Sequence, residues 1–184
     1  FVATVNAIRY VNAIPIFADV KSLEDLTIDP DEIEKKITPR TKAIMLMHYG
    51  GFACDMKRIM AIAEKYNLKV IEDAAQAIGA VYKGRRACML GDGAALSFFP
   101  SKNLGGAGDG GMVVTNDDAL AQGVRLLRSH GAVGTYIHSV VGTNSRLDAL
   151  QAAVLLVKLA HLDEWAQERR ANAAYYNEQF ADTP

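Results

Sequence analysis

No stretch of the sequence carries five like charges in a row, and its 20 basic and 21 acidic residues leave a formal net charge of -1. This balance argues against a nucleic-acid arm and against a helix that binds a membrane surface. No apolar run approaches the roughly 18 residues needed to cross a bilayer, and the first residues have neither the basic start nor the cleavage site of a secretory signal. We therefore expect a cytoplasmic protein whose partner is a small molecule.

Cysteine is also scarce. Cys54 and Cys88 lie far apart and form no CxxC or histidine-partnered pattern, so the sequence predicts buried free thiols, with no metal site and no redox pair. The 184 residues, half of them apolar, are enough for one globular domain with a sizeable core. The chain opens on Phe1 rather than methionine and stops directly after a helical pattern, which suggests a piece of a longer protein.

Between Pro15 and Thr115, short β-prone runs alternate with amphipathic stretches, a pattern typical of α/β units on a largely parallel sheet. Their nearly continuous apolar character predicts strands that are covered on both faces. The predicted strands are residues 15–20, 42–48, 69–73, 95–99 and 111–115.

Apolar residues at helical spacing predict a helix after Asp55, which can cap it. A second helix is predicted to begin at Asn116 or Asp117 and to end at Gly131. The helical pattern over 146–180 is too long for one uncapped helix, so we expect a break near residues 161–163.

Charged residues lie at the end of one predicted strand and shortly after the end of another. Glu72 and Asp73 end the third strand, and Lys102 comes shortly after the fourth. Ligands of open α/β sheets gather at the carboxyl ends of the strands. A carboxylate there either caps the next segment or faces a ligand, and we expect the acid and the lysine to meet in one cleft.

The glycine-rich run after Lys102 contains the spacing GxGxxG, but it precedes a strand and opens no helix, so a dinucleotide fingerprint is excluded. A Walker loop is excluded because Asn103 follows the lysine. What remains is a turn that allows close backbone approach, beside a lysine whose apolar neighbours disfavour the charged amine. Such a lysine forms Schiff bases, and an aspartate held against it suggests pyridoxal 5'-phosphate, whose ring nitrogen the acid would keep protonated.

Several segments, in order along almost the whole chain, resemble the DegT/DnrJ/EryC1/StrS family of pyridoxal phosphate-dependent nucleotide-sugar aminotransferases. The resemblance implies the large domain of the aspartate aminotransferase-like fold (fold type I), a three-layer α/β sandwich with a mostly parallel sheet. Residues 1–161 would form the cofactor-binding large domain without its N-terminal part, and residues 162–184 a helix leading towards an absent C-terminal small domain. The likeness is carried mainly by "HYGGFACDMKRIMAIA" (48–63), "VIEDAAQAIGAVYKGR" (70–85), "GDGAALSFFPSKNLGGAGDGGMVVTND" (91–117) and "GTNSRLDALQAAVLLVKL" (142–159).

The resemblance implies a role for each of four residues within these segments. Lys102 would bind the cofactor as a Schiff base and then move protons. Asp73 would pair with the pyridinium nitrogen, and Gln76 would hydrogen-bond the phenolic oxygen. Ser97 would hold the phosphate. Taken singly, Asp73 could instead be a cap, Gln76 a surface amide and Ser97 a strand-end hydroxyl.

Two further residues follow from the same resemblance. Asn144 would reach a phosphate bound by the neighbouring subunit, which implies a homodimer with shared active sites; its alternative is a turn residue or helix cap. Phe1 would stack on the cofactor ring, although an aromatic residue at a chain start more often packs in the core. His48 and His130 lie in matching segments, but we assign them no role.

The implied reaction moves an amino group from an amino acid, usually L-glutamate, to a keto carbon of a nucleotide-linked sugar, for aminosugar, polysaccharide or glycosylated metabolite biosynthesis. The stretch around His138 favours a 3-keto sugar. Lysine rather than histidine at position 102 favours transamination over the dehydration catalysed by a related branch. Two alternatives stay open: a noncatalytic ligand-binding or regulatory module of the same fold, and an unrelated α/β domain. Since family chains are longer, we expect this chain alone to be inactive.

Overall fold

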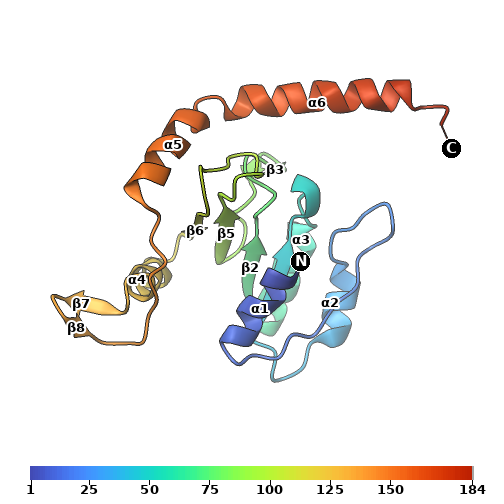
Figure 1. Ribbon diagram of the computed structural model, residues 1–184. Coiled ribbons are helices and arrows are strands. Elements are labelled where there is room, and N and C mark those ends of the chain that lie inside the picture. The colour runs from blue at the N-terminus through green and yellow to red at the C-terminus, as the bar shows by residue number, and fades with distance from the viewer. Residues whose placement is uncertain (184) are drawn as a thin grey trace. The chain divides into compact units, whose positions relative to one another are not determined.

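A computed structural model describes residues 1–183, which divide into two compact units. The first unit combines Phe1–Leu96 with Met112–Arg146, and the second combines Ser97–Gly111 with the chain from Leu147 onward. Figure 1 labels most of the elements of the first unit. They are α1 (Val2–Tyr10), α2 (Pro30–Lys36), β1 (Ala43–Met47), the 3-10 turn Tyr49–Gly51, α3 (Met56–Tyr66), β2 (Lys69–Asp73), β3 (Val81–Tyr82), β4 (Arg85–Arg86), most of β5 (Gly93–Ser97) and β6 (Gly111–Val114), α4 (Asp118–Leu127), β7 (Ala132–Gly134) and β8 (Ile137–His138).

The main sheet has four strands in the order β1-β2-β5-β6. β1 runs parallel to β2, with Met47 opposite Asp73. β2 runs parallel to β5, with Asp73 opposite Ala95. The α/β architecture with a mostly parallel sheet is therefore confirmed, and the carboxyl ends of β1, β2 and β5 share one edge of the sheet.

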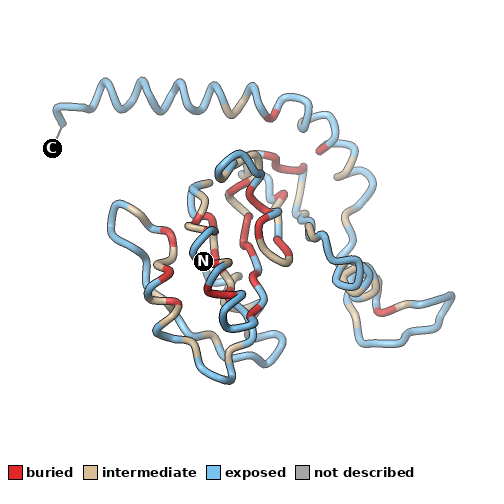
Figure 2. Tube along the Cα trace, turned by 180° about the vertical axis from the view of Figure 1, so that it is seen from behind, coloured by how far each residue is buried: buried red, intermediate tan, exposed pale blue. Residues whose placement is uncertain are grey.

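The core of the first unit lies between α2, α3 and the strands β1 and β2, where the buried segments cluster in Figure 2. Asp55 caps α3 by accepting a hydrogen bond from the Arg58 N–H, and Asn67 ends the helix in a left-handed conformation. The helix turns one apolar face to the sheet. The buried members of this cluster are Ile33, Ile44, Leu46, Cys54, Met56, Ile59, Ile62, Ala63, Leu68, Val70 and Leu90.

Both cysteines are buried and free, as the sequence predicted. Burial raises the pKa of the Cys54 thiol to about 11 and that of the Cys88 thiol to about 11. Cys88 also has a φ of 76°, in the left-handed region that non-glycine residues rarely adopt.

One predicted strand is wrong. Residues 15–20 form no strand, and only Val20 makes an isolated bridge, to Ile28. Ile16 is 66% exposed and Phe17 71%. A strand needs a backbone partner as well as β-prone side chains, and no other segment of residues 1–183 pairs with 15–19.

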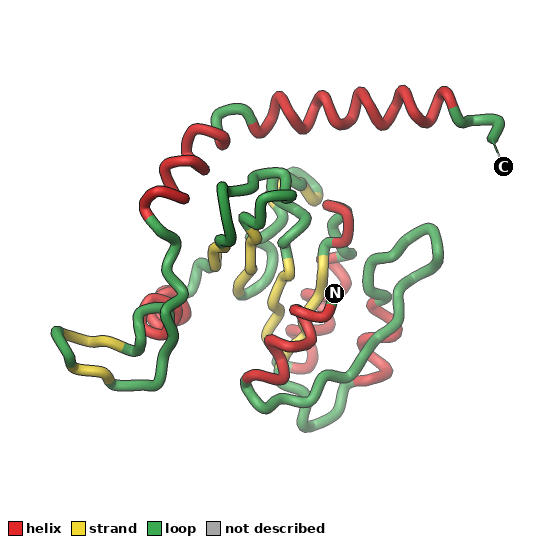
Figure 3. The backbone as a smooth tube through the Cα atoms, viewed as in Figure 1, coloured by secondary structure: helices red, strands yellow, loops and turns green. Residues whose placement is uncertain are grey.

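The helix boundaries are confirmed in part. Asp117 caps α4 by accepting from the N–H groups of Ala119 and Leu120, but the helix ends at Leu127, before the predicted Gly131. The short hairpin of β7 and β8, which no pattern predicted, follows it (Figure 3). In the second unit, α5 (Ala149–Leu159) and α6 (Leu162–Gln179) are separate helices, which confirms the predicted break.

Ile59→Ala tests the core. Ile59 is fully buried, so its truncation should lower the free energy of unfolding by about 2–5 kcal/mol. The matched control, Ile16→Ala, truncates the same side chain where it is exposed and should change that free energy by less than about 0.5 kcal/mol. Urea unfolding followed by circular dichroism measures both. Equal shifts for the two variants would contradict the assigned core.

Candidate functional site

Asp73 is the last residue of β2 and is 9% exposed. Its Oδ2 accepts a 2.5 Å hydrogen bond from the Thr4 hydroxyl of α1, and its Oδ1 accepts one of 3.1 Å from the Ala75 N–H. Its carbonyl oxygen accepts from the His48 N–H at 3.1 Å. Asp73 therefore caps the turn that follows β2 with one oxygen, while the other oxygen faces α1.

Gln76 lies in the turn after β2 and is half-buried. Its Oε1 accepts a 2.7 Å hydrogen bond from the Gly50 N–H. Because a backbone N–H can only donate, this contact fixes which end of the amide is the oxygen. The amide NH₂ is left as the donor that Gln76 can offer to a ligand oxygen.

Glu72 and His48 form a buried pair beside Asp73. Both side chains are 0% exposed, and His48 Nε2 lies 2.8 Å from Glu72 Oε2. His48 Nδ1 accepts a 3.2 Å hydrogen bond from the Cys54 N–H, so the ring proton must be on Nε2, which donates to Glu72. The sequence had offered Glu72 as a cap or a ligand group and had given His48 no role.

Three backbone N–H groups complete the coordination of Glu72. Oε2 also accepts from Cys88 at 2.9 Å, and Oε1 accepts from Leu90 at 2.8 Å and from Gly91 at 2.7 Å. Burial by itself would raise the pKa of Glu72, but the hydrogen bonds from His48 and these N–H groups outweigh it and lower the pKa. Glu72 is thus an ionised structural group whose oxygens are committed within the protein.

Lys102 belongs to the second unit, on a loop held by backbone hydrogen bonds from Lys102 N–H to the Phe99 carbonyl and from Gly106 N–H to the Phe98 carbonyl. A Cβ on Gly105 would lie 2.3 Å from the Pro100 carbonyl oxygen, closer than real side chains allow. The close backbone approach predicted for the glycine-rich turn is therefore confirmed. Lys158 of α5 donates to the Gly105 carbonyl and ties the loop to that helix.

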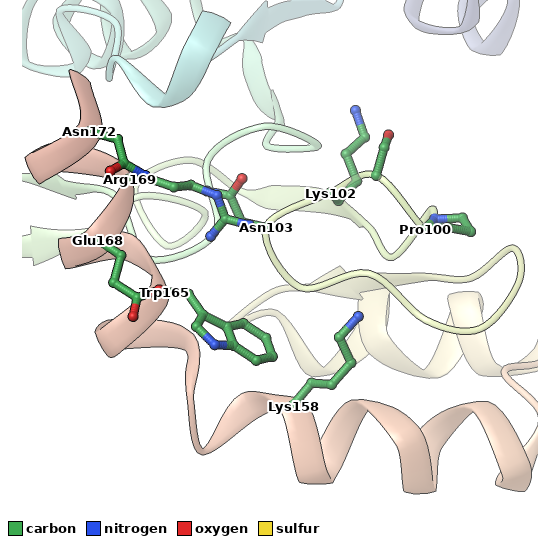
Figure 4. Close-up of a pocket in the computed structure, with 9 residues that line it drawn as sticks. Pro100, Lys102, Asn103, Lys158, Trp165, Glu168, Arg169 and Asn172 are labelled. Carbon is green, nitrogen blue, oxygen red and sulfur yellow. The ribbon is translucent and has the colours of Figure 1, made fainter. Parts of the chain in front are cut away.

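The loop and the helices α5 and α6 line an open pocket of about 440 Å³ within the second unit. Figure 4 shows Lys158 reaching from α5 towards the loop, whereas the Lys102 amine points away from Trp165 and Lys158. Among residues 1–183, no ion pair involves Lys102. Lys102 as a residue is half-buried, and its amine is uncommitted to a carboxylate of the part of the chain that the structure describes.

Three other predicted residues have simple surroundings. Ser97 ends β5 and its Oγ accepts from the Phe99 N–H at 3.3 Å, which leaves the hydroxyl proton to be donated. Asn144 is exposed and its Oδ1 accepts from Arg146 Nε at 3.0 Å. Phe1 is 86% exposed, so the alternative that it packs in the core is wrong.

The described residues fit the predicted cofactor in their chemistry. Asp73 offers a carboxylate to a pyridinium nitrogen, Gln76 offers a donor to a phenolic oxygen, and Ser97 offers a donor to a phosphate. Lys102 offers an amine free of carboxylate partners within residues 1–183. Asp73 and Gln76 lie in the first unit, and Lys102 and Ser97 in the second. The same residues contain no group of three histidine, cysteine, aspartate or glutamate side chains placed to hold a metal ion, and none of their helices has the length and apolarity of a membrane span.

The sequence model of the DegT/DnrJ/EryC1/StrS aminotransferase family matches residues 1–184, and the chain belongs to this family. It is 51% identical over 176 residues to a pleiotropic regulatory protein of Geobacillus stearothermophilus, covering 96% of this chain and 47% of the relative. It is also 51% identical over 179 residues to the UDP-N-acetyl-3-dehydro-α-D-glucosamine 3-aminotransferase of Acidithiobacillus ferrooxidans, covering 97% and 48%. The chain spans about half the length of these relatives.

Solved structures show the same likeness. The chain superimposes on Streptomyces venezuelae DesV in complex with a ketimine intermediate with a TM-score of 0.94 and 45% identity, covering 100% of this chain and 49% of DesV. Against NtdA from Bacillus subtilis with bound cofactor PMP, the TM-score is 0.89 at 39% identity, with 99% and 41% covered. These likenesses confirm the predicted fold class and agree with the predicted cofactor.

Glu72→Gln should change the dependence of stability on pH. Since the folded-state pKa of Glu72 lies below its ordinary value of 4.5, ionised Glu72 stabilises the native state in full above about pH 4.5, and this contribution is lost as the pH falls through the folded pKa. Urea unfolding between about pH 6 and pH 3 should therefore show that the difference in the free energy of unfolding between wild type and Glu72→Gln becomes smaller as the pH falls. Glu64→Gln, at an exposed position of α3, should change the free energy of unfolding by less than about 0.5 kcal/mol. A difference in the free energy of unfolding that grows as the pH falls would refute the conclusion that ionised Glu72 stabilises the fold.

Proposed function

We propose that the whole protein is a pyridoxal phosphate-dependent aminotransferase that moves an amino group from L-glutamate to a keto carbon of a nucleotide-linked sugar. The observation that carries the proposal is the joint presence of Asp73 at the end of β2, Gln76 in the turn that follows it and Lys102 on the loop after β5, in a chain that belongs to this family. Packing alone does not require a lysine at position 102. We assign residues 1–161 to the cofactor-binding large domain and residues 162–184, which include α6, to a segment that leads to a second domain.

When bound, pyridoxal phosphate supplies an electron sink for the carbanion formed at the substrate carbon and carries the amino group between the two substrates. Asp73 keeps the ring nitrogen protonated, and the Thr4 hydroxyl holds the Asp73 carboxylate in place. Gln76 donates its amide NH₂ to the phenolic oxygen. Ser97 donates its hydroxyl to the phosphate.

Lys102 has two tasks in this proposal. Its amine first anchors the cofactor covalently. When free, Lys102 Nζ would move a proton from the α-carbon of glutamate to the C4' carbon of the cofactor, and in the second half of the reaction it would move a proton from C4' to the sugar carbon that becomes aminated. An amine on a flexible side chain, free of carboxylate partners within residues 1–183, suits both transfers.

The sugar substrate is proposed to be a 3-keto nucleotide sugar. The stretch around His138 favours this class, and the relative from Acidithiobacillus ferrooxidans is named for amination at carbon 3. Such a substrate fits a cytosolic biosynthetic enzyme that makes aminosugars for polysaccharides or glycosylated metabolites.

We also propose a homodimer in which Asn144 of one subunit binds the cofactor phosphate of the other, and in which Phe1 stacks on the ring. Asn144 is exposed, and its amide NH₂ is left to donate because Oδ1 accepts from Arg146. Phe1 likewise presents an exposed ring.

The alternative to this proposal is a noncatalytic ligand-binding or regulatory module of the same fold. The two candidates differ in what Lys102 does. A binding module needs no covalent link to the cofactor and no release of 2-oxoglutarate from glutamate, whereas the aminotransferase needs both.

Lys102→Ala separates these candidates. The whole protein with pyridoxal phosphate should absorb visible light, borohydride should fix the cofactor on Lys102, and L-glutamate should yield 2-oxoglutarate. The variant should lose the fixed cofactor, and its 2-oxoglutarate formation should fall at least about a hundredfold, because the proton carrier is gone. Mass spectrometry of the peptides and a 2-oxoglutarate assay measure these outcomes. The control Lys83→Ala, at an exposed hairpin position, should behave as wild type. A colourless wild-type protein that ignores the cofactor would favour the regulatory module.

Mixed dimers test the shared site. Lys102→Ala and Asn144→Ala should each be impaired as homodimers. If Asn144 serves the partner's cofactor, a heterodimer of the two variants contains one site with both changes and one intact site, so its activity should recover to about half of the wild-type level. Affinity purification with two tags isolates the heterodimer. Activity no higher than the mean of the two homodimers would show that Asn144 acts within its own subunit.

A further inference from the structure

We propose that Glu72 and His48 are positioning residues that hold Asp73 and Gln76 in the arrangement the cofactor requires. This inference rests on the proposed function for its cofactor part, whereas its structural part concerns the chain by itself. Neither residue touches the reacting groups in this account. Each acts through the backbone of a turn that carries or contacts a cofactor-binding side chain.

Burial of Glu72 and His48 costs desolvation free energy. An ionised carboxylate and an imidazole with no exposed surface lose their hydration, and only a full set of hydrogen bonds offsets that loss. Glu72 receives four, from His48 Nε2 and from the N–H groups of Cys88, Leu90 and Gly91. A well-packed apolar pair would avoid the cost of desolvation, so packing alone gives no reason for these residue types at these positions.

Glu72 and His48 lie directly beside Asp73. Glu72 and Asp73 are consecutive on β2, so their side chains leave the strand on opposite faces. Glu72 fixes the end of β2 from one face while Asp73 projects from the other towards Thr4. The His48 N–H also donates to the Asp73 carbonyl, so the end of β1 is tied to the end of β2 both through this main-chain bond and through the side-chain contact between His48 and Glu72.

The turn that follows His48 also contacts Gln76. The turn after β1 contains Gly50 at a φ of 60° and Gly51 at a φ of 85°. Because glycine has no Cβ, its backbone is less restricted than that of other residues, so this turn has little rigidity of its own. His48 anchors this turn at its start through Glu72 and at its end through the Cys54 N–H. The Gly50 N–H in turn orients the Gln76 amide. Loosening the His48 anchor therefore frees the group that aims Gln76.

A glutamine at position 72 would break this network with little change in shape. Both oxygens of Glu72 accept two N–H donors each, one pair being His48 Nε2 and the Cys88 N–H. Whichever oxygen is replaced by NH₂, two donors then face a donor. His48 cannot relieve the conflict by moving its proton to Nδ1, because Nδ1 faces the Cys54 N–H.

The experiment compares Glu72→Gln with Asp92→Asn in the whole protein. Asp92 is a matched control because its carboxylate also binds β2, but at the opposite end, through the Val70 N–H and Lys69 Nζ. Two quantities are measured: amide hydrogen exchange at Gly50 and Cys54 without cofactor, and the Kd for pyridoxal phosphate. Glu72→Gln should speed exchange and raise the Kd by roughly tenfold or more. Asp92→Asn should leave both within about twofold of wild type, even where it lowers the melting temperature.

His48→Gln is the second variant, in case Glu72→Gln does not fold. It retains an amide donor for Glu72 but not the imidazole geometry, so it should change both quantities in the same direction and by less. A Kd that Glu72→Gln and Asp92→Asn raise equally would overturn the inference, since both would then act only through stability. If the wild type binds no pyridoxal phosphate, the proposed function fails, and unchanged exchange at Gly50 and Cys54 would overturn the positioning role separately.

Discussion

A single buried carboxylate organises the carboxyl edge of the sheet in the first unit. Glu72 stands one residue before the end of β2, and its two oxygens receive the His48 ring and three backbone N–H groups. Through these contacts, the end of β1, the end of β2 and the loop before β5 are bound to one point. A charge without solvent contact tolerates little displacement of its donors, because every lost hydrogen bond exposes the full cost of desolvation. The precision of this edge depends on that constraint.

The second unit reaches a defined loop by a different route. The Lys102 loop has no buried charge at its centre, and its shape comes from backbone contacts that only glycine permits at position 105, together with a lysine from α5. The first unit thus relies on buried hydrogen bonds to a charged group, and the second on close backbone packing at a glycine. Both devices use main-chain atoms to fix the positions from which side chains act.

The sequence predicted the features that depend on local pattern. The strands β1 and β2, the capped helix α3 and the break before α6 follow from apolar periodicity and caps, so they were found with nearly correct bounds. Residues 15–20 were assigned wrongly, because β-prone side chains do not tell whether a pairing partner is present. The exposed α1, with no side-chain cap, and the β7–β8 hairpin gave no such signal. The pair of Glu72 and His48 joins residues 24 positions apart, a tertiary contact that periodicity cannot reveal. The family itself was predicted, because it rests on ordered motifs, whereas the roles of Lys102, Asp73, Gln76, Ser97, Asn144 and Phe1 remain predictions.

The two thiols have a practical implication. Cys54 and Cys88 are buried, and both have pKa values of about 11, so neither presents a thiolate to solvent near neutral pH. A cysteine introduced at an exposed position would therefore react with maleimide reagents far faster than either native thiol. Fluorophores or spin labels can be attached on each unit without first removing the natural cysteines, which makes the separation between the units open to direct spectroscopic measurement.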